Sequence, residues 1–192
     1  PIWGDVKRIL RIKKCRTEQK ELKKMRHKKS ISGSISHAYC YLTAKLGRIF
    51  FRSSMYWEKR YAAGGDSGVG SFGKLAFYKA GVINSFIREN NIKNVIEFGC
   101  GDGNQLQYFD MPEYIGVDVS KTAVETCKKR FAGDIGKEFY TYDQFVNKAD
   151  GVRKAELTLS IDVLYHLVED EVFQSYISEL FRYSSRYVVI YS

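Results

Sequence analysis

The chain has 192 residues, of which 44% are hydrophobic and 28% are charged, a composition typical of one soluble globular domain with its own core. Its formal net charge of +9 comes from residues 1–30, where 12 Lys or Arg accompany 3 Asp or Glu, whereas residues 31–192 hold 19 residues of each sign. A neutral body argues against a domain that grips nucleic acid along its phosphate backbone.

Cysteine spacing and hydropathy exclude further classes of protein. The cysteines form no CxxC pair and are irregularly spaced, so we expect no zinc or other metal site, no disulfide framework, and a reducing, cytoplasmic compartment; they are Cys15, Cys40, Cys100 and Cys127. No apolar run reaches the roughly 18 residues that span a membrane. The basic start lacks the apolar segment of a secretory signal, and because the first residue is Pro1 rather than Met, we expect the natural chain to begin earlier.

The first part of the chain divides into an arm and a linker. Residues 5–29 are strongly basic with few apolar residues, which we interpret as a solvated helix or arm, with a membrane-surface helix and a nucleic-acid contact as alternatives. We assign residues 1–31 to this arm and residues 32–55 to a helical linker. The linker carries an apolar stripe at helical spacing, formed by Tyr39, Leu42, Leu46 and Ile49.

A glycine-dense stretch separates the linker from the rest of the chain. Residues 61–73 (YAAGGDSGVGSFG) predict a mobile loop, which is a candidate lid over a site. The segment after it predicts a helix, because apolar residues recur on one face at Ala76, Ala80, Ile83 and Ile87.

From residue 94 onward, short β-branched or aromatic segments alternate with helical ones. We predict strands at 94–98, 114–118, 138–142, 157–161 and 187–191. We predict helices at 121–131, with Ser120 as N-cap, and at 169–183, with a buried stripe of Val172, Tyr176 and Leu180. This alternation predicts an α/β fold in which helices cover both faces of a mostly parallel sheet.

The segment VIEFGCGDGNQ, residues 95–105, follows the first of these strands. Glycines at positions 99, 101 and 103 allow a sharp turn and bring backbone N–H groups close to a ligand. A dinucleotide site of the GxGxxG type would need a third glycine at position 104, which is Asn104. The carboxylates of Glu97 and Asp102 flank the loop and would repel a pyrophosphate, so a cationic ligand fits better.

A further acid ends the second predicted strand. Asp118 lies 19 residues after Gly99, where a carboxylate accepts hydrogen bonds from both hydroxyls of a ribose. The ligand should therefore carry a ribose and a positive charge but no phosphate. S-adenosylmethionine has these three properties, and we predict it as the cofactor.

The pattern ExGxGxG after a strand, with an acid ending the next strand, resembles the class I S-adenosylmethionine-dependent methyltransferases, which have a Rossmann-like fold. The resemblance covers about residues 56–192, which we assign as the methyltransferase domain, and includes the segments YWEKRY and SIDVLYHL. The stretch YWEKRYAAGGDSGVGS, residues 56–71, is further similar to small bacterial methyltransferases of surface-polysaccharide or glycan gene clusters.

The resemblance implies a role for individual residues. Glu97 and the loop from Gly99 to Gly103, including Cys100, Gly101 and Asp102, would line the methionine end of the cofactor. Asp118 would hold the ribose, Val119 would lie beside the adenine, and Asp143 would accept from the adenine amino group. Ile161 and Asp162 would face the sulfonium and the acceptor, and Trp57 and Tyr61 would cover the cofactor.

Two residues near this set have a less specific assignment. His166 we interpret first as a structural histidine, and a general base, if the acceptor is a hydroxyl, is the alternative. Cys100 we interpret as a small filler residue rather than a nucleophile, because no His lies nearby in the sequence.

The sequence departs from the family at its end. The family sheet has seven strands, the last two forming an antiparallel edge, whereas this sequence stops at Ser192 after the fifth predicted strand, so two strands are lacking. No earlier segment is recognisable as their replacement. An open fifth strand, 187–191, would favour self-association, unless a partner or residues 35–52 cover it.

Three functions are therefore compatible with the sequence. The first is methyl transfer to a small-molecule or glycan acceptor, which the neutral body and the glycine loop favour. The second is methylation of RNA or protein, with the basic arm recruiting an acidic substrate. The third is a catalytically inactive binding or scaffolding module, which the shortened sheet suggests.

Overall fold

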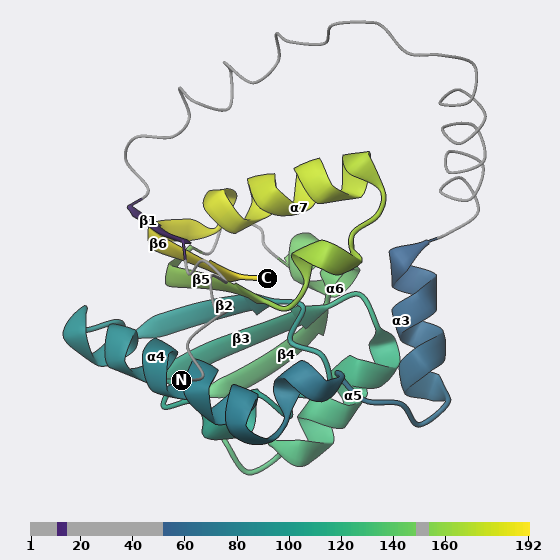
Figure 1. Ribbon diagram of the computed structural model, residues 1–192, viewed down its shortest axis with the longest axis horizontal. Coiled ribbons are helices and arrows are strands. Elements are labelled where there is room, and N and C mark those ends of the chain that lie inside the picture. The colour runs from purple at the N-terminus through teal and green to yellow at the C-terminus, as the bar shows by residue number, and fades with distance from the viewer. Residues whose placement is uncertain (1–10, 15–51, 149–153) are drawn as a thin grey trace, which may run out of the picture.

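The computed structural model describes residues 11–14, 52–148 and 154–192, and it shows a twisted sheet with helices on both faces (Figure 1). The apolar stripe of the predicted linker, from Tyr39 to Ile49, lies outside the described residues, as does the basic arm apart from residues 11–14.

Five strands run parallel in the order β4-β3-β2-β5-β6. They are β2 (Asn94–Phe98), β3 (Glu113–Asp118), β4 (Lys137–Thr141), β5 (Ala155–Ile161) and β6 (Ser184–Tyr191). Each coincides with a predicted strand to within a few residues. The α/β prediction, with a mostly parallel sheet, is confirmed.

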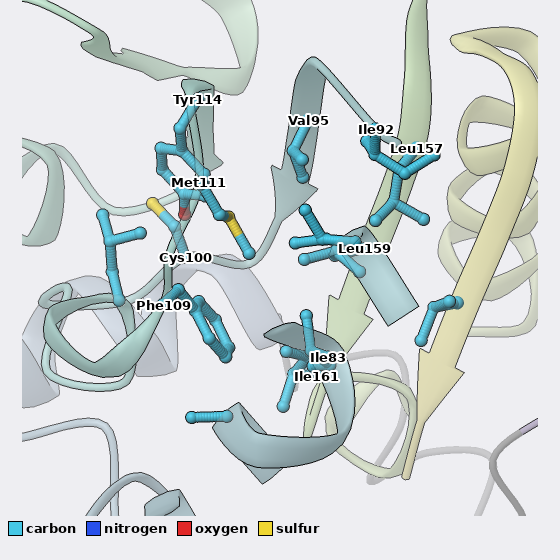
Figure 2. Packing of buried hydrophobic residues seen from close by; sticks show 14 of the residues in the cluster. Ile83, Ile92, Val95, Cys100, Phe109, Met111, Tyr114, Leu157, Leu159 and Ile161 are labelled. Carbon is cyan, nitrogen blue, oxygen red and sulfur yellow. The ribbon is translucent and has the colours of Figure 1, made fainter. Parts of the chain in front are cut away.

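Helices cover the two faces of this sheet. On one face, α4 (Gly73–Glu89) and α5 (Lys121–Arg130) pack on side chains that point alternately from the strands. This cluster holds Ile83, Val95, Val124, Leu157 and Leu159, and Figure 2 shows part of it. On the other face, α6 (Tyr142–Lys148) and α7 (Asp170–Arg182) cover a second cluster, which includes Ile96, Phe98, Phe145 and Leu180.

Local sequence signals explain where the helices begin. The Ser120 hydroxyl accepts from the Ala123 amide at 3.1 Å, which confirms the predicted N-cap of α5. In α7, Asp170 and Glu171 occupy the first turn, where the helix dipole favours acids. Helix α6 was not predicted, because its seven residues bury only Phe145 and leave too little periodicity to recognise.

The edge of the sheet differs from the prediction. Strand β1 (Arg11–Lys14), which belongs to the basic arm, pairs antiparallel with Tyr187–Ile190 of β6. An earlier segment therefore does cover the fifth parallel strand, and the expectation of a helix or solvated arm at residues 11–14 is wrong. The backbone of β6 offers hydrogen-bonding groups on its open side, and a short antiparallel strand satisfies them. Self-association through β6 stays a prediction.

A remaining helix, α3 (Ser53–Ala62), lies across the carboxyl ends of the strands, beside α5 (Figure 1). It begins three residues before the predicted start of the domain at residue 56. No helix of the described part of the chain is long and apolar enough to cross a bilayer.

Candidate functional site

A cavity of about 530 Å³ opens at the carboxyl ends of the parallel strands. The chain order reverses at β2, because β3 and β4 follow on one side of it and β5 and β6 on the other. Ligands of open α/β sheets bind at this reversal, outside the carboxyl ends of the strands. Helix α3 adds the wall of the cavity that the sheet cannot provide, through Ser53, Ser54, Trp57 and Tyr61.

Most of the predicted site residues meet around this cavity. The twelve that line it come from α3, the glycine loop and the ends of the strands: Trp57, Tyr61, Glu97, Gly99, Cys100, Gly101, Asp118, Val119, Asp143, Ile161, Asp162 and His166. Asp102 and Gly103 are not among the residues that line it. The roles of all fourteen in binding stay predictions.

The glycine loop has a backbone that other residues would strain. Gly99, Gly101 and Gly103 have φ angles of +80°, +57° and +73°, in the left-handed region. At Gly99 an added Cβ would lie 2.3 Å from Val163 Cγ2, and at Gly101 it would lie 2.4 Å from Ser67 Oγ. These glycines are therefore required both by conformation and by the close approach of neighbouring segments.

The amides of this loop are all used within the protein. Those of Gly99 and Cys100 donate to the Val117 carbonyl, and that of Gly101 donates to Asp118 Oδ2 at 2.9 Å. The next three also have acceptors within the chain: Asp102 N donates to Ser67 Oγ, Gly103 N to the Cys100 carbonyl, and Asn104 N to Asp102 Oδ1. The expectation that this loop presents N–H groups to a ligand is therefore wrong.

This arrangement has a consequence for the kind of ligand. A pyrophosphate binds where a loop and a helix N-terminus direct free N–H groups at it. Here the amides of residues 99–104 are occupied, and the segment that follows is the short 3-10 helix η2 (Leu106–Tyr108) rather than an α-helix. The ends of β2 and β3 instead bring the carboxylates of Glu97 and Asp118 to the cavity, which suits a cation.

Asp118 is the carboxylate at the end of β3. It is buried, and its two oxygens accept from the amides of Gly101, at 2.9 Å, and Ser120, at 2.8 Å. Burial raises the pKa of Asp118, and the two amide bonds oppose that shift. Each carboxylate oxygen has a second lone pair, so the group is fixed in place and can still accept from a ligand.

Glu97, at the end of β2, is held by the hydroxyl of Tyr114, which donates to Glu97 Oε2 at 2.5 Å. Burial raises the pKa of Glu97 to about 7, although the Tyr114 bond and the charge of Lys79 act in the opposite direction. A cationic group in the cavity would favour the ionised form. Glu97 is therefore a carboxylate whose charge depends on what the cavity contains.

Asp102 and Gly103 stabilise the conformation and packing of the glycine loop. The Asp102 carboxylate accepts from the hydroxyl of Ser67 at 2.6 Å and from the amide of Asn104 at 3.0 Å, which ties the 61–73 stretch to the glycine loop. Gly103 lies against α5, where an added Cβ would be 2.8 Å from a ring carbon of Phe131. In this structure the predicted lid is folded against the site, with the 3-10 helix η1 (Val69–Ser71) within it.

Two carboxylates fasten α3 over the cavity. Glu58 accepts at 2.7 Å from the hydroxyls of both Ser120 and Thr122 at the start of α5, and these bonds lower the pKa of Glu58. At the start of α3, Glu169 accepts from the amide of Ser53 at 2.8 Å and from the Ser53 hydroxyl. Helix α3 thus bridges the N-termini of α5 and α7.

Aromatic rings of α3 form one wall of the cavity. Trp57 and Tyr61 are one turn apart, with ring centroids 5.7 Å from each other. The His166 ring meets Trp57 edge-on at 4.8 Å, and burial lowers the pKa of His166. His166 is therefore neutral at pH 7 and has a free lone pair on one ring nitrogen, as a general base requires.

Asp162, which directly follows β5, forms a buried ion pair. Its carboxylate accepts from Lys79 Nζ of α4 at 2.5 Å, and Lys79 is only 2% exposed. Asp162 has a φ angle of +58°, and its amide donates to the Tyr191 carbonyl at 2.8 Å. The pair fixes the position of the carboxylate in a backbone conformation that non-glycine residues adopt rarely.

The remaining predicted residues lie around the same opening. Val119 is half-exposed after β3, Asp143 is exposed in the first turn of α6, and Ile161 is buried at the end of β5. Val172 was predicted to be buried, but it is 44% exposed and lines the cavity. It lies near the start of α7, which extends past the edge of the second cluster.

Several lining or supporting residues were missed from the sequence. Glu58 and Glu169, which hold α3 in place, each accept a hydrogen bond from a residue more than 60 positions away in the sequence, so no local pattern reveals them. Lys79 follows the buried Ala76 by three residues on the core face of α4, and a lone lysine there could have indicated a buried ion pair. Gln105, directly after the glycine loop, is buried and lines the cavity.

Cys100 and Cys127 are both buried free thiols. Their sulfurs converge on the Gly101 carbonyl, at 3.8 Å and 3.1 Å, and burial together with contact between the two thiols raises the pKa of Cys100. A protonated thiol is a poor nucleophile, which agrees with the interpretation of Cys100 as a filler residue. In the described part of the chain no cluster of three metal-binding side chains occurs.

Part of the chain is similar to a known protein family. A family model described as a methyltransferase domain matches residues 96–184, from β2 to the start of β6. No curated protein matches the chain.

Solved structures share the fold. The methyltransferase domain of bacterial CtHen1 is 23% identical, with a TM-score of 0.50, over 61% of this chain and 65% of that one. The N-methyltransferase NodS from Bradyrhizobium japonicum WM9, solved with S-adenosyl-L-homocysteine, is 14% identical, with a TM-score of 0.57, over 73% of this chain and 72% of that one. At these identities the likeness establishes a Rossmann-like methyltransferase fold.

Proposed function

We propose that this chain is an S-adenosylmethionine-dependent methyltransferase that acts on a small-molecule or saccharide acceptor. The observation that carries the proposal is the cavity at the reversal of the sheet. There the glycine loop, with its amides occupied, meets the carboxylates of Glu97 and Asp118. The family match over residues 96–184 and the shared fold support methyl transfer independently of this geometry.

The residues present fit the cofactor. Asp118 would hold the ribose through the lone pairs that its two amide bonds leave open. Glu97 would face the cationic methionine end, where a positive charge favours its ionised form. Val119 and Asp143 would flank the adenine, and the rings of Trp57 and Tyr61 would close the cavity from α3.

When bound, the cofactor supplies a methyl group already activated by its sulfonium. The protein must then hold the acceptor in line with that methyl group and exclude water. Hydrogen bonds hold α3 at its start, where Ser53 donates to Glu169, and in its middle, where Glu58 accepts from α5, and so close the cavity on the side away from the sheet. Neutral His166 lies beside Trp57 and can accept a proton from the acceptor.

The size and charge of the site support a small acceptor. The cavity of about 530 Å³ has to hold the cofactor and the acceptor together. The chain from residue 31 onward has no net charge, which disfavours a long polyanionic substrate. A saccharide acceptor rests on the resemblance of residues 56–71 to methyltransferases of glycan gene clusters.

Calorimetric titration with S-adenosylhomocysteine tests the cofactor site. We expect micromolar binding by the wild-type chain and a loss of about 100-fold or more in Asp118→Ala, because two charge-assisted bonds of about 1.5–3 kcal/mol each are removed. Asp110→Ala is the matched control, because Asp110 is exposed and does not line the cavity. Undiminished binding by a folded Asp118→Ala chain would contradict the assigned role.

A further inference from the structure

Among the described residues, the charged side chains that line the cavity are all acidic. Five carboxylates line it, those of Glu97, Asp118, Asp143, Asp162 and Glu169, and no Lys or Arg is among the described residues that do so. The one histidine in the lining is His166, whose lowered pKa leaves it neutral at pH 7. An acceptor that carries a phosphate or a carboxylate would therefore enter without a cation to pair with.

Two cations in the described part of the chain lie close to residues that line the cavity, and both are paired. Lys79 donates to Asp162 at 2.5 Å and is almost completely buried. Arg60, whose guanidinium lies 5.7 Å from the Trp57 ring centroid, pairs with Asp66 at 3.1 Å and also donates to the Asp66 carbonyl at 2.7 Å. Neither cation can turn to an anionic acceptor without breaking an ion pair.

A separate observation points to a ligand that donates hydrogen bonds. Gln105 lines the cavity and is 6% exposed. Its Nε2 donates to the Ala76 carbonyl at 3.0 Å, whereas its Oε1 has no donor among the described residues. Because a buried acceptor without a donor costs about 1–3 kcal/mol, the group is expected to find its donor in what the cavity binds.

We propose that the acceptor is an amine and that the methyl group is transferred to its nitrogen. The inference rests on the proposed function. The amine enters as an ammonium ion, attracted by the carboxylate of Glu169, which lines the cavity and has no ion pair with a described Lys or Arg. A hydroxyl could also donate hydrogen bonds to Gln105, but it would gain nothing from the negative charge of Glu169.

Methyl transfer to an amine needs the amine, the bound cofactor and a proton acceptor. The bound ammonium first loses a proton, either to His166 or to solvent, which frees its lone pair. The nitrogen lone pair then forms a bond to the methyl carbon as the carbon–sulfur bond breaks. The bonding electrons go to sulfur, leaving a neutral thioether, and the methylated ammonium releases or keeps its remaining proton according to its pKa.

Matched pairs of ligands test the inference through binding. The chain is saturated with S-adenosylhomocysteine and titrated with benzylamine against benzyl alcohol and benzoate, and with glucosamine against glucose. We expect each amine to bind about tenfold more tightly than its alcohol, the difference between a charge-assisted and a neutral hydrogen bond, and benzoate not to bind. With S-adenosylmethionine, the methylated product of the same pairs should be the N-methyl compound.

Variants test whether the Glu169 carboxylate causes the preference. Glu169→Gln should remove most of the difference between amine and alcohol, and Gln can still accept from Ser53, so any loosening of α3 should weaken the binding of both ligands alike. Glu171→Gln removes the same charge from the exposed side of α7 and is the control.

The outcomes separate this inference from the function on which it rests. Equal or tighter binding of the alcohols, or O-methyl products, overturns the amine proposal while S-adenosylhomocysteine binding preserves the methyltransferase. An amine preference that survives Glu169→Gln overturns the role of this carboxylate. Failure of the folded chain to bind S-adenosylhomocysteine contradicts the proposed function itself.

Discussion

The two ends of the cavity are built in different ways. The glycine-loop end comes from one continuous stretch, residues 95–105, together with Asp118 on the neighbouring strand, and its amides are bonded within the protein. The other end is assembled from three separate segments, the start of α3, the 3-10 helix η3 (Leu164–His166) and the start of α7, fastened by single side chains such as Glu169. The position of the first end is set by backbone geometry. The position of the second end is set by individual side chains, which substitutions can change.

The two ends differ in how readily their ligand specificity can change. A backbone-built site admits few substitutions, so it suits a ligand that stays the same while acceptors vary. A side-chain-built site can change its acceptor by substitutions that leave the fold intact. The predictions that follow test this contrast, from the largest expected effect to the smallest.

Gly101→Ala should damage the glycine-loop end most. The left-handed φ angle of +57° costs an alanine about 1–2 kcal/mol, and the added Cβ displaces Ser67, so we expect a loss of more than about 2 kcal/mol in unfolding free energy together with cofactor binding. Chemical denaturation and S-adenosylhomocysteine titration measure both.

Gly81→Ala is the matched control for that substitution. Gly81 lies inside α4, where an added Cβ meets no atom within 4 Å, so alanine should stabilise the chain by about 0.5–1 kcal/mol. If Gly101→Ala and Gly81→Ala changed the unfolding free energy and cofactor binding equally, the special role of the glycine-loop backbone would be contradicted.

Glu97 should make the stability of the unliganded chain depend on pH. Its folded-state pKa of about 7 lies above the ordinary value of 4.5, so the folded state binds the proton more tightly. The resulting stabilisation is complete below about pH 4.5 and is lost as pH rises through 7, by on the order of 3 kcal/mol. Unfolding by denaturant at a series of pH values measures this loss.

Glu97→Gln should flatten that dependence while keeping the bond from the Tyr114 hydroxyl. Binding of a cationic ligand near pH 7 should release a proton from Glu97 in the wild-type chain, and calorimetry in buffers of different ionisation enthalpy would detect it. A pH profile identical in wild type and variant would show that another group titrates.

Glu58→Gln should have the smallest effect, because it loosens only one fastening of α3. Replacing the two charge-assisted bonds to Ser120 and Thr122 with neutral ones should cost about 1 kcal/mol and weaken cofactor binding roughly fivefold. Faster hydrogen exchange of the α3 amides should accompany the change, with the glycine loop unaffected. Lys59→Gln, on the exposed side of α3, is the control, and equal effects of the two variants would contradict the fastening role.

Much of the fold and the glycine-loop end could be predicted from the sequence. The strands have alternating or continuous apolar patterns, and the spacing of Gly99, Gly101, Gly103 and Asp118 reflects the geometry of two adjacent parallel strands and the loop between them. Residues with local signals, such as Ser120 at the start of α5, were placed correctly for the same reason.

The rest could not be predicted, because its signals are not local. Pairing of β1 with β6 joins residues more than 170 positions apart, and a strand of four basic and apolar residues has no distinctive pattern. The amide of Asp102 in the glycine loop donates to Ser67, which reaches it from a different segment. The acceptor end depends on the contact of Ser53 with Glu169, 116 positions away, so the sequence alone left the acceptor open.

The central claim is that this cavity accepts a cationic nucleoside and rejects a pyrophosphate. Side-by-side calorimetric titration of the chain with S-adenosylmethionine and with nicotinamide adenine dinucleotide tests it most directly. The occupied amides of residues 99–104 and the carboxylates of Glu97 and Asp118 predict micromolar binding of the first and no measurable binding of the second. Tighter binding of the dinucleotide would contradict the account.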